Sequence, residues 1–120
     1  MIEWGVTLQG GDDTVLGIFG YANWSQIHRR AEIGYCLRRD YWRQGIGLEA
    51  LSAIIAFGFQ AMDLNRIHAC PWVENVASVR LLEKLGFRRE GVLRDEYWEE
   101  GAFHDEALYA LLRREYLPLS

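Results

Sequence analysis

Short apolar runs alternate along this chain with two longer segments whose apolar residues recur every 3.6 positions. The short runs, bounded by turn residues, predict strands at residues 3–9, 14–21, 30–37, 66–72, 87–98 and 102–116. The longer segments predict helices at residues 45–62 and 75–85. The order β-β-β-α-β-α-β-β puts one parallel crossover into a mostly antiparallel sheet. The pattern therefore predicts an α/β fold with a mixed sheet, and residues 1–120 form a single predicted domain.

Turn and cap residues between these segments support the same division. Residues 10–13, Gly-Gly-Asp-Asp, predict the turn of a hairpin that joins the first two strands. Residues 22–29 are predicted to form a polar loop. Asn75 is expected to cap the second helix, and Gly86 stands where a helix-ending glycine belongs.

Two glycines, Gly45 and Gly47, open the first predicted helix directly after an arginine-rich turn. Unpaired amides at a helix start attract an anion, and glycine lets it approach the backbone closely. The segment therefore predicts a phosphate-bearing cofactor at residues 43–48. The same glycines fit the dinucleotide fingerprint G-x-G-x-x-G/A, but that turn follows its strand directly, whereas residues 38–44 intervene here. A dinucleotide site is the less favoured alternative.

The uneven distribution of charge narrows the choice of ligands. The net charge of −4 argues against direct nucleic-acid binding. Basic residues gather before the glycines, at Arg29, Arg30, Arg38, Arg39 and Arg43. Acidic residues gather near the end, at Glu90, Asp95, Glu96, Glu99, Glu100, Asp105 and Glu106. This distribution favours an anionic cofactor and a cationic second substrate, although any single charge can be part of an ordinary solvated face.

Cysteine and histidine positions predict no metal site. Cys36 and Cys70 lie in strand-like runs without ligand spacing, and the histidines are widely separated. Buried free thiols in a reducing cytoplasm are the expected interpretation. The longest apolar run, near residues 48–62, is interrupted by polar residues and shorter than the ~20 residues that a membrane span needs. No membrane association is expected.

Four blocks together resemble the GNAT acetyltransferases, and within them the RimJ/RimL-like N-acetyltransferases. The resemblance extends over about residues 3–116. The blocks are residues 31–37 (AEIGYCL), 41–50 (YWRQGIGLEA), 75–87 (NVASVRLLEKLGF), and 90–94 (EGVLR) with 105–109 (DEALY). They resemble the family's central strand, acetyl-CoA pyrophosphate loop, second cofactor helix and closing hairpin. The resemblance implies a GNAT-like sheet with its central strand splayed at the acetyl-CoA site.

The resemblance also implies acetyl-CoA as cosubstrate, without a metal. The implied binding residues are Leu37, Arg38, Arg43, Gln44, Gly45, Ile46, Gly47, Leu48, Asn75 and Ser78. One position departs from the family pattern. The superfamily often has Arg or Gln three residues before the first glycine, where this chain has Trp42. Contacts at that position are therefore expected through the backbone.

Four implied catalytic groups each have an alternative. Glu32 resembles the family's general base, or it is a structural carboxylate paired with Arg29 or Arg30. The Cys36 backbone N–H would polarise the thioester carbonyl, while its thiol is expected to be packing. Ser78 resembles a group near the leaving thiolate, or it merely caps the helix. Tyr97 stands where relatives place a catalytic side chain, or it is a cross-strand packing aromatic.

The expected reaction is acetyl transfer to a primary amine, either a protein N-terminus or a small amine, by direct attack in a ternary complex. The alternative is a CoA-binding or structural module without catalysis. The family's first strand and its two acceptor-side helices have no counterpart in this sequence. Apolar surface near Trp4, Phe57 and Phe59 is therefore expected to be uncovered, which predicts a homo-oligomer.

Overall fold

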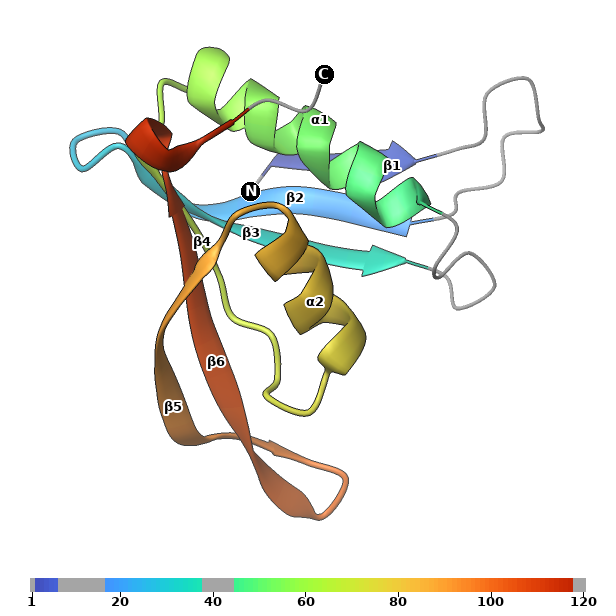
Figure 1. The fold of residues 1–120 in the computed structure, drawn as a ribbon. Helices are drawn as coiled ribbons and strands as arrows, with labels where there is room; N and C mark the ends of the chain where they lie inside the picture. The colour runs from blue at the N-terminus through green and yellow to red at the C-terminus, as the bar shows by residue number, and fades with distance from the viewer. Residues whose placement is uncertain (1, 7–16, 38–44, 118–120) are drawn as a thin grey trace.

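One six-stranded sheet and two helices make up the described part of the chain (Figure 1). The computed structural model describes residues 2–6, 17–37 and 45–117. The sheet order is β1-β2-β3-β4-β6-β5. The strands are β1 (Ile2–Val6), β2 (Gly17–Ser25), β3 (Arg30–Leu37), β4 (Arg66–Ala69), β5 (Arg88–Glu99) and β6 (Ala102–Leu112). The helices are α1 (Ile46–Gln60) and α2 (Val76–Lys84), followed at the end by the 3₁₀ turn η2 (Arg113–Glu115). The predicted fold class is confirmed, because β3 and β4 are parallel and the other neighbouring strands of the described residues are antiparallel.

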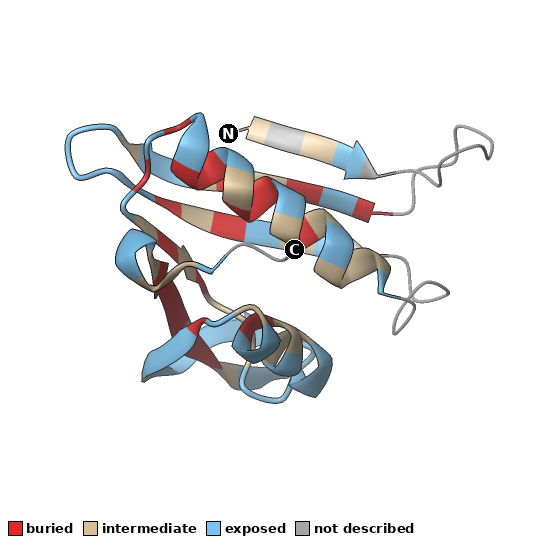
Figure 2. Ribbon diagram, turned by 45° about the horizontal axis from the view of Figure 1, so that its top comes forward, coloured by how far each residue is buried: buried red, intermediate tan, exposed pale blue. Residues whose placement is uncertain are grey.

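Helix α1 lies along one face of the sheet over β2, and its buried residues belong to the core (Figure 2). Its buried residues follow the predicted period, at Leu51, Ile54, Ile55 and Phe59. The hydroxyl of Tyr21 on β2 donates a 2.8 Å hydrogen bond to the carbonyl of Ile54. Gly58 makes this approach possible, because a Cβ there would collide with the Tyr21 hydroxyl. The helix is thereby fixed against β2.

Strands β3 and β4 diverge after a short parallel contact. Only three residue pairs join them, and the last of these is Glu32 opposite His68. Beyond it β3 stays with β2 as far as the pair Gly17 and Leu37. The chain after β4 instead follows β6, where the Ala107 amide donates to the Pro71 carbonyl at 2.8 Å. An opening between β3 and the segment 69–73 results, and the β3 backbone beside it lacks β4 as a ladder partner.

Alternation along the strands gives the two faces of the sheet different residues. On β3, Ala31 and Ile33 are buried on the helix-covered face. Glu32, Gly34 and Cys36 lie on the opposite face, because neighbouring side chains of a strand point to opposite sides. This second face is called the open face below.

The predicted ends of three strands were wrong. Strand β2 continues to Ser25 through part of the predicted polar loop, because Ala22 and Ser25 pair with β3. Strand β4 ends at Ala69, although pairing resumes at one bridge between Trp72 and Glu106. Strand β6 ends at Leu112, and the chain then turns into η2 instead of continuing to residue 116. The predicted hairpin turn at residues 10–13 lies outside the described residues.

Both predicted signals around α2 are confirmed. The Asn75 side chain accepts a 3.2 Å hydrogen bond from the Ser78 amide and so caps the helix. Gly86 follows the helix with a φ of 95°, a conformation that favours glycine. Neither helix of the described residues is long and apolar enough to cross a membrane.

Candidate active site

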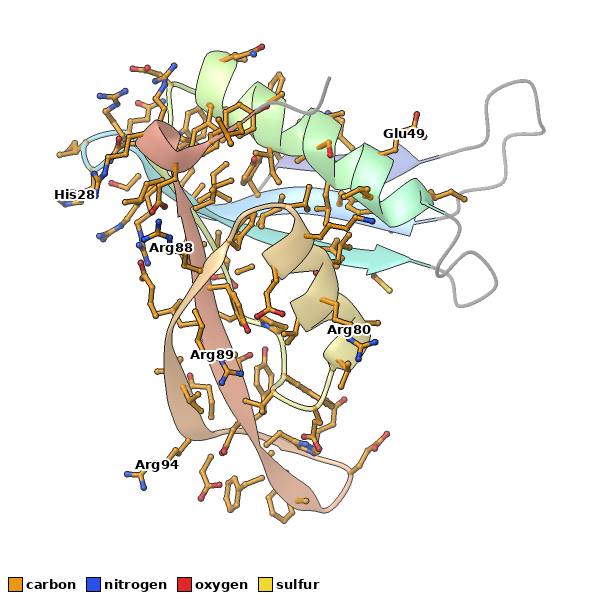
Figure 3. The ribbon with its side chains drawn as sticks, viewed as in Figure 1. His28, Glu49, Arg80, Arg88, Arg89 and Arg94 are labelled. Atoms are coloured by element: carbon orange, nitrogen blue, oxygen red, sulfur yellow. The ribbon has the colours of Figure 1, made fainter. Side chains whose placement is uncertain are left out.

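The start of α1 exposes backbone amides without a side-chain cap. Gly45 precedes the helix with a φ of 79° and has open space within 4 Å of where a Cβ would stand. The first helical residues are Ile46, Gly47 and Leu48. Amides in a first turn have no intrahelical acceptors, so this end of the helix can hold an anion such as the predicted pyrophosphate. Figure 3 shows the one acidic residue of this turn, Glu49, on the outer side of the helix.

The predicted cofactor loop falls mostly outside the described residues. Arg38, Arg43 and Gln44 lie outside the described residues, as does the side chain of Leu37. Their roles toward acetyl-CoA stay predictions.

Ser78 joins the start of α2 to β3. Its hydroxyl shares a short hydrogen bond with the hydroxyl of Tyr35. Burial raises the pKa of Tyr35, while the bond to Ser78 acts in the opposite direction. Tyr35 therefore keeps its proton at neutral pH. The helix cap comes from Asn75, which leaves the Ser78 hydroxyl outside the cap.

Glu32 contacts an amide and an imidazole on the open face. Asn23 Nδ2 donates to Glu32 Oε1 at 3.1 Å, and His68 Nε2 lies 3.6 Å from the same oxygen. The structural alternative predicted that Glu32 pairs with Arg29 or Arg30, and these predicted partners were wrong. Arg29 instead binds Asp63, 3.0 Å away across the turn after α1.

His68 is a residue of the site that the sequence interpretation missed. Burial lowers its pKa, and the nearby Arg66 guanidinium adds to this effect, while Glu32 opposes it. At neutral pH the group beside Glu32 is therefore a neutral imidazole. The register of the parallel strands β3 and β4 places Glu32 directly opposite His68. The spacing of these two residues along the sequence does not reveal the contact.

An open groove of about 450 Å³ lies beside Glu32. Its lining residues are Ile18, Gly20, Tyr21, Ala22, Glu32, Gly34, Tyr35 and Cys36. Cys36 is exposed, so the prediction of a buried thiol was wrong for this residue. Its backbone belongs to the part of β3 that lies beyond the last pair with β4. Amides there alternate between β2 and the opening.

Tyr97 lies with two other rings at some distance along the hairpin. It pairs with His104 across β5 and β6, and its ring centroid is 6.1 Å from that of Trp72. The Trp72 ring in turn stacks on His104 at 4.4 Å. These contacts are those of the packing alternative, and the catalytic role of Tyr97 stays a prediction.

The second cysteine, Cys70, follows β4 and is half-buried. Burial and the neighbouring carboxylates of Glu32, Glu106 and Glu96 raise its pKa to about 11. A thiol in this state is a poor nucleophile at neutral pH. Among the described residues, no group of three or more His, Cys, Asp or Glu side chains could hold a metal ion.

Residues 1–88 match the family model described as an acetyltransferase (GNAT) domain. The chain belongs to the GNAT acetyltransferase family. An uncharacterized N-acetyltransferase of Bacillus subtilis, YoaA, is 38% identical over 112 residues, which are 93% of this chain and 63% of that protein. The Escherichia coli [ribosomal protein uS5]-alanine N-acetyltransferase is 31% identical, over 84% of this chain and 54% of its own length. The predicted family is thereby confirmed.

Solved structures of GNAT proteins share this fold. A GNAT-family acetyltransferase from Bacillus anthracis is 33% identical with a TM-score of 0.83, over 94% of this chain and 67% of that one. The ribosomal-protein-S5-alanine acetyltransferase of Vibrio fischeri is 28% identical with a TM-score of 0.80, over 87% and 57%. The chain thus spans about three fifths of the length of the curated relatives named above, 63% and 54%.

Proposed function

We propose that this chain carries an acetyl-CoA-dependent N-acetyltransferase site that transfers the acetyl group to a primary amine by direct attack in a ternary complex. The observation that carries the proposal is the opening between β3 and β4, with the pair Glu32 and His68 at its closed end. The start of α1 and the Ser78 hydroxyl of α2 both belong to elements that adjoin β3. Membership of the GNAT family supports the same reaction class.

The cosubstrate would be held at the two helix starts. The amides of Gly45 to Leu48 would bind its pyrophosphate, and Asn75 and Ser78 would contact the pantetheine arm. Bound acetyl-CoA supplies an activated thioester. Backbone N–H groups of β3 beside the opening, the Cys36 amide among the predicted ones, would polarise the thioester carbonyl.

Glu32 would accept the proton of the amine. Asn23 fixes one carboxylate oxygen by a hydrogen bond, and the neutral imidazole of His68 adds no competing positive charge. General-base catalysis of this kind contributes about 10²–10⁴-fold to a rate. Ser78 would hydrogen-bond the leaving thiolate, because the protonated Tyr35 hydroxyl can donate to the Ser78 oxygen.

The acceptor is proposed as a protein N-terminal amine or a small amine. Relatives carry names of both kinds, the Escherichia coli ribosomal-protein enzyme and, at 24% identity, the Escherichia coli spermidine N(1)-acetyltransferase. The open face, with Glu32 in its groove, suits a cationic acceptor of either class.

Self-association and a cytoplasmic location are part of the proposal. Phe57 is 41% exposed and packs edge-on against Trp4 of the edge strand β1, so an apolar strip lies beside an unpaired strand edge. Phe59, which was also predicted to be uncovered, is buried in the core instead. Light scattering that shows only monomer at micromolar concentration contradicts a homo-oligomer. The free cysteines favour a reducing compartment such as the cytoplasm.

The cofactor site is tested by the thermal shift that acetyl-CoA produces. Binding to the folded state alone raises the melting temperature. We expect Gly45→Val and Gly47→Val to abolish this rise, because a branched side chain blocks the phosphate approach. Gly101→Val is the matched control, since Gly101 has a φ of 76° but lies in the β5–β6 turn. An undiminished shift in both α1 variants puts the pyrophosphate elsewhere.

Catalysis is tested separately by release of free CoA. The chain is incubated with acetyl-CoA and a panel of small amines and peptides with free N-termini. Turnover with any of these amines or peptides supports the proposed N-acetyltransferase function. Acetyl-CoA binding without turnover supports the alternative, a CoA-binding module, and a thermal shift with NAD but not CoA supports the dinucleotide binder.

A further inference from the structure

His104 is a residue of β6 that the proposed mechanism does not use, and both nitrogens of its ring contact hydrogen-bond acceptors. Nδ1 lies 2.5 Å from a carboxylate oxygen of Glu74, and Nε2 lies 3.0 Å from the backbone carbonyl oxygen of Glu99. An ionised carboxylate and a carbonyl oxygen only accept hydrogen bonds, so both ring nitrogens must donate. A ring that donates from both nitrogens is an imidazolium cation.

The surroundings of the His104 ring favour this cation. The ring of Trp72 stacks on it, with the centroids 4.4 Å apart and the planes 12° apart, which is suitable geometry for a cation–π contact. The hydrogen bond to Glu74 raises the pKa of His104 most, the Glu99 carbonyl adds to this effect, and the charge of Glu100 acts in the same direction.

His104 also has a register partner on β5, which is Tyr97. The groups that face the ring are therefore an indole and a carboxylate from the segment before α2, a phenol from β5, and a carbonyl and a carboxylate from the turn between β5 and β6.

Two of these contacts, those to Trp72 and Glu74, reach the segment 72–75 that leads into α2. This segment lies alongside β6 (Figure 1), where the Val73 amide donates a 3.0 Å hydrogen bond to the carbonyl of Asp105. The Asn75 amide donates to the Trp72 carbonyl at 3.0 Å and closes a turn. Asn75 is the residue that caps α2. The ring of His104 is thus attached to the turn from which α2 begins.

We propose that His104 is a positioning residue of the cosubstrate site, which ties the β5–β6 turn to the segment 72–75 and so holds the start of α2 for the pantetheine arm of CoA. This inference rests on the proposed placement of that arm at Asn75 and Ser78. A neutral ring has a single N–H and can donate to only one of its two acceptors. Loss of the proton therefore frees either the carbonyl of Glu99 or the carboxylate of Glu74.

The arrangement links CoA binding to the protonation of His104. Because the ring holds α2 in place only as a cation, the affinity for CoA should be highest below the folded pKa of His104 and should fall as the pH rises through it. Glu74 keeps that pKa raised, so removing its charge should move the fall in affinity to lower pH. A contact that served stability alone would not move this midpoint.

The experiment is calorimetric titration with CoA between pH 5 and 9. The ratio of variant Kd to wild-type Kd is taken at each pH, so that the ionisation of CoA itself cancels. His104→Gln should raise the Kd about fivefold or more at low pH and change it little at high pH, where the wild-type ring is neutral. Glu74→Gln should shift the wild-type course to lower pH.

Two controls separate positioning from a general effect. His28→Gln, at an exposed histidine of the turn between β2 and β3, should keep the wild-type course. Adenosine 3′,5′-bisphosphate, which lacks the pantetheine arm, should bind His104→Gln and the wild-type chain equally well.

Three results would overturn the inference: a Kd ratio for His104→Gln that is the same at every pH, an unmoved midpoint in Glu74→Gln, or an equal loss of affinity for the bisphosphate. Failure of the proposed function looks different. CoA binding with the expected pH course but without acetylation of any amine removes the catalytic proposal and leaves the role of His104 in place. A wild-type chain that binds no CoA at any pH contradicts both. If His104→Gln does not fold, Glu74→Gln decides the matter, because the Glu74 side chain is 62% exposed.

Discussion

The two faces of the sheet differ although the same strands build both. On the helix-covered face, Ala31, Ile67 and Leu111 are almost fully buried beneath α1 and the rest of the core. On the open face, their neighbours Glu32 and His68 are partly exposed polar groups that contact each other. The comparison teaches that one face supplies most of the stability and the other most of the candidate chemistry, because side chains alternate along each strand.

Adjacent residues of β4 give the largest contrast between the faces. Ile67 is fully buried, so Ile67→Ala should cost about 2–5 kcal/mol of unfolding free energy through lost burial and a cavity. His68→Ala removes a partly exposed group from a weak contact and should cost no more than about 1 kcal/mol. Urea unfolding measures both, and equal losses would contradict the division between the faces.

The substitution Gly58→Ala tests the packing of the helix-covered face by adding an atom, whereas Ile67→Ala removes atoms. Alanine favours helices by about 1 kcal/mol over glycine. Gly58→Ala should nevertheless destabilise the chain by about 1–3 kcal/mol, because the new methyl group meets Tyr21. Ala53→Gly, at an exposed position of the same helix, should cost about 1 kcal/mol and serves as the control. A more stable Gly58→Ala variant would mean that Tyr21 can move away freely.

Sequence patterns predicted the helix-covered face better than the open face. The 3.6 period of α1 and the cap at Asn75 are local signals, and the structure follows them. The partner of Glu32 depends on the register between β3 and β4, which are separated by the whole of α1. The burial of Glu106 depends on strand packing, which its place in an acidic run of the sequence does not reveal.

The hydrogen bond between Tyr35 and Ser78 joins strand β3 to helix α2. Tyr35→Phe and Ser78→Ala should each destabilise the fold modestly, and a double-mutant cycle should give a coupling of about 0.5–1.5 kcal/mol. Ser78→Ala should also slow acetyl transfer by more than the loss of folded protein explains, and Tyr35→Phe should do so to a smaller extent, because it removes the donor to the Ser78 oxygen. A coupling near zero would mean that the hydroxyls do not hold α2 to β3.

His104 on β6 is expected to give the folded chain a small pH dependence of stability. Its hydrogen bond to Glu74, at 2.5 Å, raises its pKa, and the Glu99 carbonyl adds to this effect. The folded pKa lies above the unfolded one, so the stabilisation is present in full below about pH 6.5 and is lost as the pH rises through the folded pKa. Melting temperatures measured from pH 5 to 9 should fall along this course in the wild-type chain. His104→Gln should flatten that part of the curve, and an identical slope in both would assign the effect to another group.

The pH dependence of acetyl transfer in Glu32→Gln tests the central claim most directly. Amine acceptors are protonated at neutral pH, so a general base matters most there and less at high pH, where free amine is abundant. With Glu32 as the base, the rate of the Glu32→Gln variant should fall steeply near pH 7 and approach the wild-type rate as the pH rises. A profile that keeps its wild-type shape and loses only height would show that Glu32 is a structural carboxylate.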